Sequence, residues 1–407
     1  MNAALPLYGL FDTFPGWISI TALVAAILIL GYRGASIRSW TLTIGVFLYG
    51  FGASLAGWII LAAVALLFAV PPIRQRLVSG PVLGLLQRLN FLPTISETEQ
   101  TAIEAGSVWL EGELFSGSPD LERLHEAAYP DLTSEEQAFL DGPVEKVCAM
   151  VDNWDVHVNK RLPDEVWDYL KEERFFGLII PEEYGGRGFS ASANSAVVSK
   201  LASRSSPLAI TVMVPNSLGP GELLSHYGTD AQQEHYLPRL VTGEEMAAFA
   251  LTEPYAGSDA GSMRSRGEVF EGEDGELYLR LNWEKRYITL APIATILGLA
   301  FKLDDPENLL GKGTDLGITC ALIPTDTEGV VVNQRHDPLG VPFYNAPTEG
   351  HDVVVPVDAI IGGPEQAGNG WRMLMESLAA GRGISLPASA IRSEEHTSEL
   401  QSPSAIS

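Results

Sequence analysis

The stretch that decides the fold is Phe249-Ala250-Leu251-Thr252-Glu253-Pro254-Tyr255-Ala256-Gly257-Ser258-Asp259. Its first residues predict an apolar strand that delivers the hydroxyl of Thr252, and Pro254 ends this strand. Gly257, Ser258 and Asp259 then predict a turn with free backbone N–H groups and a second hydroxyl. Donors of this kind suit an anionic phosphate or the edge of a heteroaromatic ring. On composition alone, an ordinary turn without a ligand is the favoured interpretation.

This stretch lies where the apolar pattern of the chain changes. Before it, apolar residues recur at helical spacing, and a helix starts at Thr133 with two acidic residues in its first turn. Further helices are predicted at residues 163–176, 192–203, 219–227 and 230–241. From about residue 247 the period is two, which predicts strands at 269–270, 277–282, 294–302, 317–323, 329–333 and 351–355. A last helix is predicted at 371–382, so a β region lies between two helical regions.

Charge is distributed unevenly along the 407 residues. Residues 1–90 contain five arginines and one aspartate, whereas the whole chain has a net charge of −25. The remainder is therefore strongly acidic, which argues against nucleic-acid binding because phosphates are held by clustered Lys and Arg. Cys148 and Cys320 are the only cysteines and are far apart, so we expect neither a disulfide framework nor a cysteine metal site. The seven histidines form no ligand pair, and we expect no metal.

Two uncharged stretches dominate the start of the chain. Residues 13–32 are long enough for one membrane-spanning helix, and residues 39–73 contain three glycines and a serine in their middle, at 49–57. The second stretch is either one long tilted helix or a helical hairpin. An arginine pair lies on each side of it, and keeping both pairs in the cytoplasm favours the hairpin: Arg33, Arg38, Arg74 and Arg76. A cleaved signal peptide is disfavoured because a basic start is missing. We therefore expect an inner-membrane protein whose body faces the cytoplasm.

Several segments resemble the acyl-CoA dehydrogenases, flavoenzymes that oxidise fatty acyl-CoA thioesters. The stretch at 249–259 is similar to their T-E-P-x-A-G-S-D signature. Further matches follow the family's order: GLIIPEEYGGRG at 177–188, YLP at 236–238, KRYIT at 285–289 and the segment 362–382. The fused apolar start, together with segments 109–117 and 378–385, resembles the membrane-associated FadE-type bacterial branch.

The resemblance implies an α+β multidomain fold. Its parts are a membrane segment at 1–76 (apolar at about 13–32 and 40–70), a linker and docking segment at 77–130, a helical domain at 131–246, a β-barrel or β-sandwich domain at 247–362, and the start of a C-terminal helical domain at 363–391. Residues 392–407 look like a translated sequencing adapter, and a natural disordered tail is the alternative.

The resemblance also implies an FAD site. Phe249, Leu251 and Thr252 would line the flavin, with Thr252 bonding the edge of its ring. Gly257 would also contact the cofactor, and Ser258 would bridge the flavin and the phosphate or pantetheine groups of acyl-CoA. Tyr287, Ile288 and Thr289 would lie on the other side of the ring, with Thr289 near the hydride-accepting nitrogen; a tryptophan is usual in place of Tyr287. Arg382 would lie near the substrate, although a structural ion pair is an equal alternative.

The function implied is α,β-dehydrogenation of acyl-CoA to trans-2-enoyl-CoA in fatty-acid β-oxidation, with hydride transfer to FAD. The family's catalytic carboxylate is expected beyond Ile391, so this chain is expected to be inactive. We expect an electron-transferring flavoprotein as the partner, and a homo-oligomer for the full-length protein. Alternatives are a membrane-tethered flavin or acyl-CoA binding protein, and an acyl-CoA oxidase.

Overall fold

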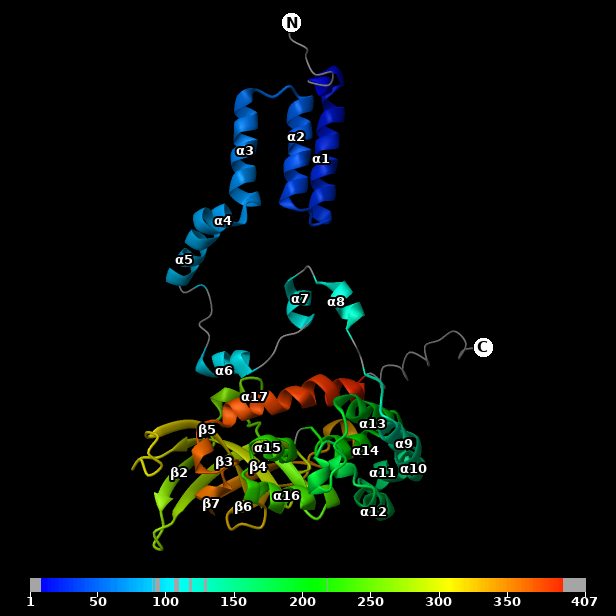
Figure 1. Ribbon diagram of the computed structural model, residues 1–407, viewed down its shortest axis with the longest axis vertical. Helices are drawn as coiled ribbons and strands as arrows, with labels where there is room; N and C mark the ends of the chain where they lie inside the picture. The colour runs from blue at the N-terminus through cyan, green and yellow to red at the C-terminus, as the bar shows by residue number, and fades with distance from the viewer. Residues whose placement is uncertain are drawn as a thin grey trace. The chain divides into compact units, whose positions relative to one another are not determined.

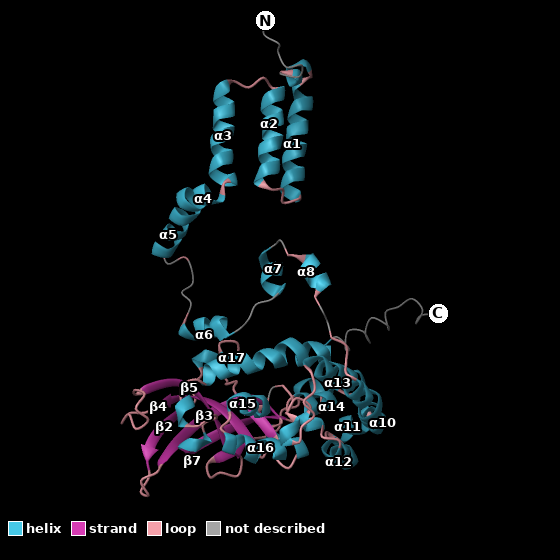
Figure 2. Ribbon diagram, in the orientation of Figure 1, coloured by secondary structure: helices cyan, strands magenta, loops and turns pink. Residues whose placement is uncertain are grey.

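The computed structural model describes residues 9–89, 91, 96–105, 110–116, 119–127, 130–217 and 219–390. The chain forms two compact units, Met1–Ile95 and Ser96–Ser407 (Figure 1). The seven strands all belong to the second unit (Figure 2). The tail predicted at 392–407 lies outside the described residues.

Three apolar helices lie side by side in the first unit: α1 (Gly16–Tyr32), α2 (Ile37–Gly50) and α3 (Leu55–Ala69) (Figure 1). The chain reverses between α2 and α3 in the glycine-rich stretch, where Gly52 has a φ of 61°. Glycine adopts this left-handed conformation without a steric penalty. The second uncharged stretch is therefore a helical hairpin, as predicted, and not one long helix. The unit ends with α4 (Pro71–Arg74), a π-helical turn (Gln75–Ser79) and α5 (Gly80–Arg88).

Membrane crossing is not supported by the helix lengths. Among the described residues, no single helix is both long and apolar enough to span a bilayer. Helix α1 is apolar but shorter, and α3 meets the criteria only as a bent pair with Pro71–Arg88, at an angle of 85°. The predicted membrane segment therefore stays a prediction.

The second unit begins with a helical region. Its helices are α6 (Glu97–Ala105), α7 (Leu110–Ser116), α8 (Leu121–Glu126), α9 (Ser134–Phe139), α10 (Glu145–Met150), α11 (Asn153–Asn159), α12 (Asp164–Glu172), α13 (Ala191–Arg204), α14 (Ser206–Met213), α15 (Pro220–Tyr227) and α16 (Asp230–Thr242). A π-helical turn, Leu140–Val144, joins α9 to α10. Thr133 and Glu136 form a reciprocal capping box at the start of α9, which satisfies N–H groups that a first helical turn leaves free.

Two helix predictions need correction. The helix predicted at 163–176 ends at Glu172, because Arg174 takes a left-handed conformation with a φ of 56°. Helix α14 is not among the helices that the sequence pattern predicts. Pro207 occupies the first turn of α14, where its missing N–H costs no hydrogen bond. The helices predicted at 192–203, 219–227 and 230–241 are confirmed by α13, α15 and α16.

Seven strands follow: β1 (Ala247–Ala250), β2 (Arg266–Glu271), β3 (Leu277–Thr289), β4 (Ile296–Asp304), β5 (Asp315–Pro324), β6 (Val330–Val332) and β7 (Asn345–Pro356). They form one sheet in the order β1-β4-β2-β3-β7-β6, and β5 pairs with β4. The predicted β domain is confirmed: its strands are hydrogen-bonded as a single sheet, and its form as a barrel or a sandwich stays a prediction. Strand β4 connects the parts of this sheet. One of its edges pairs with both β1 and β2, and its other edge pairs with β5.

Two strands are longer than predicted. The hairpin strand predicted to end at 282 continues to Thr289, and the strand predicted from 351 begins at Asn345. These two extensions pair with each other, so that Ile288 faces Ala346 and Thr289 faces Asn345. Because the pairing is antiparallel, the end of β3 and the start of β7 build one end of the sheet.

Helix α17 (Gly370–Ala380) and a π-helical turn (Gly381–Ser385) follow the sheet. Helix α6 lies against α17 (Figure 1), where the indole Nε1 of Trp371 donates to the carbonyl oxygen of Thr98 at 2.8 Å. A docking element was predicted at 109–117. Part of that segment lies outside the described residues, and the contact that the structure shows is made by α6.

Candidate functional site

The signature stretch forms a short strand followed by a tight turn. Strand β1 ends at Ala250, and Glu253 and Ala256 then exchange backbone hydrogen bonds of 3.1 and 3.4 Å across Pro254 and Tyr255. The predicted end of the strand near Pro254 is therefore close to the observed one. Gly257 and Ser258 follow on the surface, and a Cβ on Gly257 would meet no atom within 4 Å. This open backbone agrees with the predicted approach of a ligand.

A buried ion pair joins the turn to strand β3. The Nζ of Lys285 lies 2.9 Å from the Glu253 carboxylate and donates to the carbonyl oxygen of Leu251 at 3.0 Å. Both side chains are buried, with 0% and 3% of their surface exposed. The Arg286 N–H adds a bond of 2.8 Å to the carbonyl oxygen of Thr252. The segments 249–254 and 285–289 are thereby fixed to each other.

Glu253 is held by more than its lysine. Its carboxylate also accepts hydrogen bonds from the backbone N–H groups of Arg264 (2.6 Å) and Ser265 (3.0 Å) and from the Ser265 hydroxyl (2.5 Å). Burial alone raises the pKa of the Glu253 carboxyl, but the Lys285 charge and these bonds outweigh it and hold the pKa below its ordinary value. The carboxylate is therefore charged at neutral pH.

Glu253 and Lys285 are not among the site residues predicted from the sequence. A signal was present. Leu279, Leu281 and Trp283 occupy the inward positions of β3, and Lys285 is the next residue in that alternation. A lysine at an inward position requires a buried partner.

A β-bulge near the end of β3 changes which of its side chains are exposed. The pairing with β7 shifts between Lys285 and Ile288, and Tyr287 has a φ of 59°. Tyr287 is 51% exposed, and its ring lies 4.4 Å from the Arg286 guanidinium and 5.0 Å from the His336 ring. Bulges re-aim side chains in this manner. Ile288, also predicted to line the flavin, has its side chain in the hydrophobic core.

Thr289 ends β3 beside a polar neighbour that the sequence analysis did not identify. The Nδ2 of Asn345 donates to the Thr289 hydroxyl at 3.1 Å. The Oδ1 of Asn345 and the Nε2 of His336 are buried and have no hydrogen-bond partner among the described residues. Buried polar atoms are normally paired, so these two atoms mark a place that a polar ligand or water would complete.

The remaining predicted residues lie in different surroundings. Phe249 and Leu251 are half-buried against a hydrophobic cluster that includes Ile180, Leu223 and Ala247. Thr252, the next residue along the chain, is also half-buried. Arg382 lies in the π-helical turn that follows α17, but its side chain is not among those described. The structure therefore connects 249–254 with 285–289, and among the described residues Ser258 forms no hydrogen bond with either segment.

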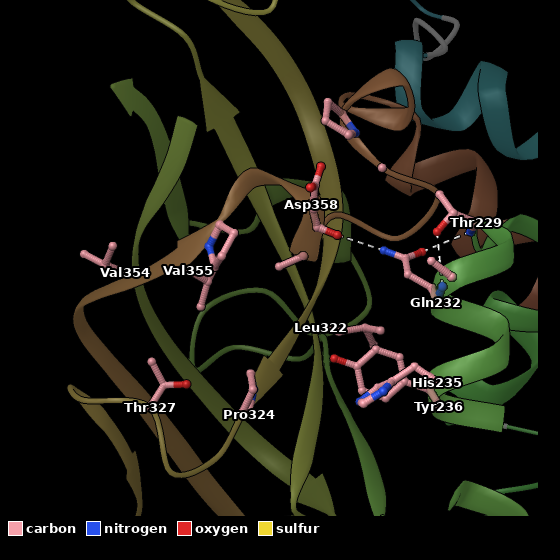
Figure 3. A pocket seen from close by; sticks show the side chains of 15 residues that line it. Thr229, Gln232, His235, Tyr236, Leu322, Pro324, Thr327, Val354, Val355 and Asp358 are labelled. Carbon is pink, nitrogen blue, oxygen red and sulfur yellow. Dashed lines mark hydrogen bonds between the residues drawn. The ribbon is translucent and has the colours of Figure 1, made fainter. Parts of the chain in front are cut away.

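A cavity lies away from these residues. It has a volume of about 630 Å³ and lies between α16 and the ends of β5 and β7, as Figure 3 shows. Its walls include Gln232, Tyr236, Leu322, Val355 and Asp358. The predicted flavin residues are absent from its lining. The cavity is therefore separate from the hydrogen-bonded motif segments.

Two family models match the chain over adjacent ranges. The acyl-CoA dehydrogenase N-terminal domain matches residues 133–244, and the acyl-CoA dehydrogenase middle domain matches residues 248–351. The break between them falls between α16 and β1.

Curated relatives share parts of the chain. Protein HemX of Proteus mirabilis is 62% identical over 89 residues, covering 22% of this chain and 52% of that protein. The probable acyl-CoA dehydrogenase FadE10 of Mycobacterium tuberculosis is 33% identical over 280 residues, covering 68% and 41%. Subunit CarC of the caffeyl-CoA reductase-Etf complex of Acetobacterium woodii is 32% identical over 229 residues, covering 56% and 56%. The chain thus spans about half the length of the curated relatives it matches.

Solved structures share the fold of the second unit. Butyryl-CoA dehydrogenase from Megasphaera elsdenii matches with a TM-score of 0.56 and 26% identity, covering 65% of this chain and 67% of that one. An acyl-CoA dehydrogenase from Bacillus anthracis, complexed with FAD, matches with a TM-score of 0.52 and 24% identity, covering 65% and 42%.

Proposed function

Because the chain belongs to the acyl-CoA dehydrogenase family, whose members are FAD-dependent oxidoreductases, we propose that this protein oxidises acyl-CoA to trans-2-enoyl-CoA in fatty-acid β-oxidation. One observation in particular supports the proposal. The turn at 252–259 and the end of β3 are joined by the buried Glu253–Lys285 pair, and both segments come from the family's motifs. A site that needs hydrogen-bond donors from both segments is therefore assembled before any ligand binds.

The residues present fit FAD. Exposed backbone at Gly257 and Ser258 suits phosphate groups, as open turns do. Hydroxyls at Thr252 and Thr289 suit the polar edge of a flavin ring, and the exposed ring of Tyr287 offers a stacking surface. The Asn345 Oδ1 next to Thr289 has no hydrogen-bond partner among the residues that the structure describes, so it could bond a ligand.

In this proposal, residues of the chain bind the flavin and hold its binding segments in position. Thr252 and Thr289 donate hydrogen bonds to the ring, and Ser258 contacts phosphate or pantetheine groups. Lys285 and Glu253 keep the two hydroxyl-bearing segments at a fixed separation. When bound, FAD supplies the acceptor for the hydride that leaves the β carbon. The substrate contact assigned to Arg382 comes from the resemblance to the family.

We further propose that the first unit associates with the cytoplasmic face of the inner membrane. Its helices expose large apolar side chains to an unusual degree: Trp17, Ile20, Leu28, Leu42, Leu55, Ile59 and Ile60. Large exposed apolar surfaces mark contact with a membrane or another protein. Its sequence contains five arginines and only one acidic residue, and this positive charge suits an anionic bilayer surface.

An electron-transferring flavoprotein is the proposed electron acceptor. Support comes from the similarity to CarC, which is a subunit of a complex with such a flavoprotein. The proposal also includes a homo-oligomer for the full-length protein. An acyl-CoA oxidase would instead pass electrons to oxygen, and a binding protein would leave acyl-CoA unchanged.

The test is FAD binding by the purified chain in detergent, followed by flavin absorbance after anaerobic addition of medium- and long-chain acyl-CoA. We expect FAD to bind, and Thr252→Val to weaken binding by about 3- to 10-fold through loss of one hydrogen bond. Thr242→Val serves as the control, because its hydroxyl bonds only the carbonyl oxygens of Pro238 and Arg239 at the end of α16. Absence of FAD binding would refute the site. Bleaching of the flavin by acyl-CoA would support the proposed dehydrogenation, and rapid reoxidation by oxygen would then favour an oxidase.

A further inference from the structure

We propose that Asn345 is a positioning residue that fixes the Thr289 hydroxyl as a hydrogen-bond donor toward the flavin. The inference rests on the FAD site proposed above, and adds to it a residue that none of the sequence motifs contains. It depends on three features of the described residues: the register of β3 and β7, the hydrogen-bond capacity of a hydroxyl, and the fixed backbone of Asn345.

Register places the two side chains together. Thr289 and Asn345 are direct partners in the antiparallel ladder. Directly opposite residues project from the same face of a sheet, with Cβ atoms about 5 Å apart. The amide Nδ2 of Asn345 is 3.1 Å from the Thr289 Oγ1, which is a normal hydrogen-bond length.

The direction of this bond determines what Thr289 can do next. A hydroxyl has one proton to donate and two lone pairs that accept. The amide nitrogen of Asn345 can only donate, so Thr289 accepts in this pair and retains its own proton. Within the described part of the chain, the Thr289 hydroxyl has no acceptor for that proton. The proton is therefore free for an acceptor on a ligand.

Asn345 itself has little freedom. Its backbone carbonyl accepts from the His336 N–H at 2.7 Å, and the neighbouring Tyr344 carbonyl accepts from the Leu290 N–H at 2.8 Å. Only 4% of Asn345 is exposed. A threonine rotates about one restricted side-chain bond, so a fixed amide on one side leaves few directions for the hydroxyl. The arrangement orients Thr289 before any ligand arrives, which is the general benefit of a preorganised site.

The experiment measures the FAD dissociation constant and the flavin absorption spectrum for the full 407-residue chain, using FAD itself as the probe. Asn345→Ala should weaken FAD binding by about 3- to 10-fold, the equivalent of one neutral hydrogen bond, and shift the flavin spectrum. Thr289→Val, which keeps the branched shape but removes the hydroxyl, should have a similar effect. In the Thr289→Val background, Asn345→Ala should then have no further effect.

Two other variants make the test sharper. Asn345→Asp keeps the side-chain volume, but its ionised carboxylate can only accept hydrogen bonds. The Thr289 hydroxyl should then donate to this carboxylate and not to the flavin, which should weaken FAD binding as Thr289→Val does. Asn333→Ala is the matched control: this asparagine follows β6 and bonds the Glu349 carboxylate at 2.7 Å, and its loss should leave FAD binding unchanged.

The outcomes separate this inference from the proposed function. If the wild-type chain does not bind FAD, the proposed function fails and the inference fails with it. If FAD binds and Thr289→Val weakens it, but Asn345→Ala and Asn345→Asp do not, only the role of Asn345 is overturned. A full effect of Asn345→Ala in the Thr289→Val background would overturn it as well, because Asn345 would then act independently of Thr289.

Discussion

The Glu253–Lys285 pair should contribute far more to stability than an exposed pair of the same length. The β domain offers a matched comparison, since Arg266 and Asp304 also lie 2.9 Å apart but expose 65% and 37% of their side chains. Exposed pairs contribute about 0–1 kcal/mol, whereas removing one partner of a buried pair costs about 3–5 kcal/mol. The prediction is that Lys285→Met is strongly destabilising and Arg266→Met is not.

The two halves of the buried pair should differ in a predictable manner. Without Lys285, the Glu253 carboxylate keeps three donors from Arg264 and Ser265. Without the Glu253 charge, Lys285 keeps only the Leu251 carbonyl oxygen. Each orphaned group can also change its protonation, which limits the cost at pH 7 to about 4 kcal/mol for a carboxyl and about 5 kcal/mol for a lysine. Glu253→Gln should therefore cost more than Lys285→Met, and the double variant less than the sum of both.

The assay is urea unfolding followed by tryptophan fluorescence at several pH values. In Glu253→Gln, the buried lysine prefers to be neutral, so its pKa in the folded chain lies below the unfolded value. The unfolding free energy of this variant should then rise with pH until the lysine of the unfolded chain also loses its proton, near pH 10. Equal losses for Lys285→Met and Arg266→Met would refute the reasoning, as would a Glu253→Gln variant that is insensitive to pH.

Three further predictions follow from burial and packing. Burial raises the pKa of Glu136, but the hydrogen bonds from its neighbours outweigh this and lower it to about 2. About 1–3 kcal/mol of stability should therefore be lost as the pH falls from about 5 to 2, and Glu136→Gln should flatten that part of an acid unfolding curve. Gly350→Ala should destabilise the β domain by about 1–3 kcal/mol in the same urea assay, because its Cβ would lie 2.1 Å from the Trp283 ring. Burial raises the pKa of Cys148 to about 11 and of Cys320 to about 12. A thiol reagent at pH 8 should thus react quickly only after unfolding, and fast labelling of the folded chain would contradict this.

Much of the fold could be predicted because local signals agree with the tertiary structure. The helix start at Thr133 carries its own capping box, and the glycine-rich stretch around Gly52 marks the turn between α2 and α3. The lengths of β3 and β7 could not be predicted in this way. Their extensions depend on each other, through pairs such as Ile288 with Ala346, and such pairing joins residues more than fifty positions apart. No pattern within either segment reports that partner.

The candidate site shows more clearly that a local sequence pattern does not report the effect of strand pairing. Period-two alternation along β3 predicts that Lys285 and Tyr287 share a face, yet Lys285 is buried and Tyr287 is exposed. The bulge between Lys285 and Ile288 changes the phase, which turns the tyrosine outward while the lysine stays beneath the turn with Glu253. A motif of five consecutive residues thus serves two purposes: its first residue fastens the turn at 252–254, and its last offers a hydroxyl from the opposite side of the bulge. The Tyr287 ring is half-exposed and contacts Arg286 and His336 instead of filling a closed core, so a tyrosine can stand where the family usually has the larger tryptophan without leaving a core cavity.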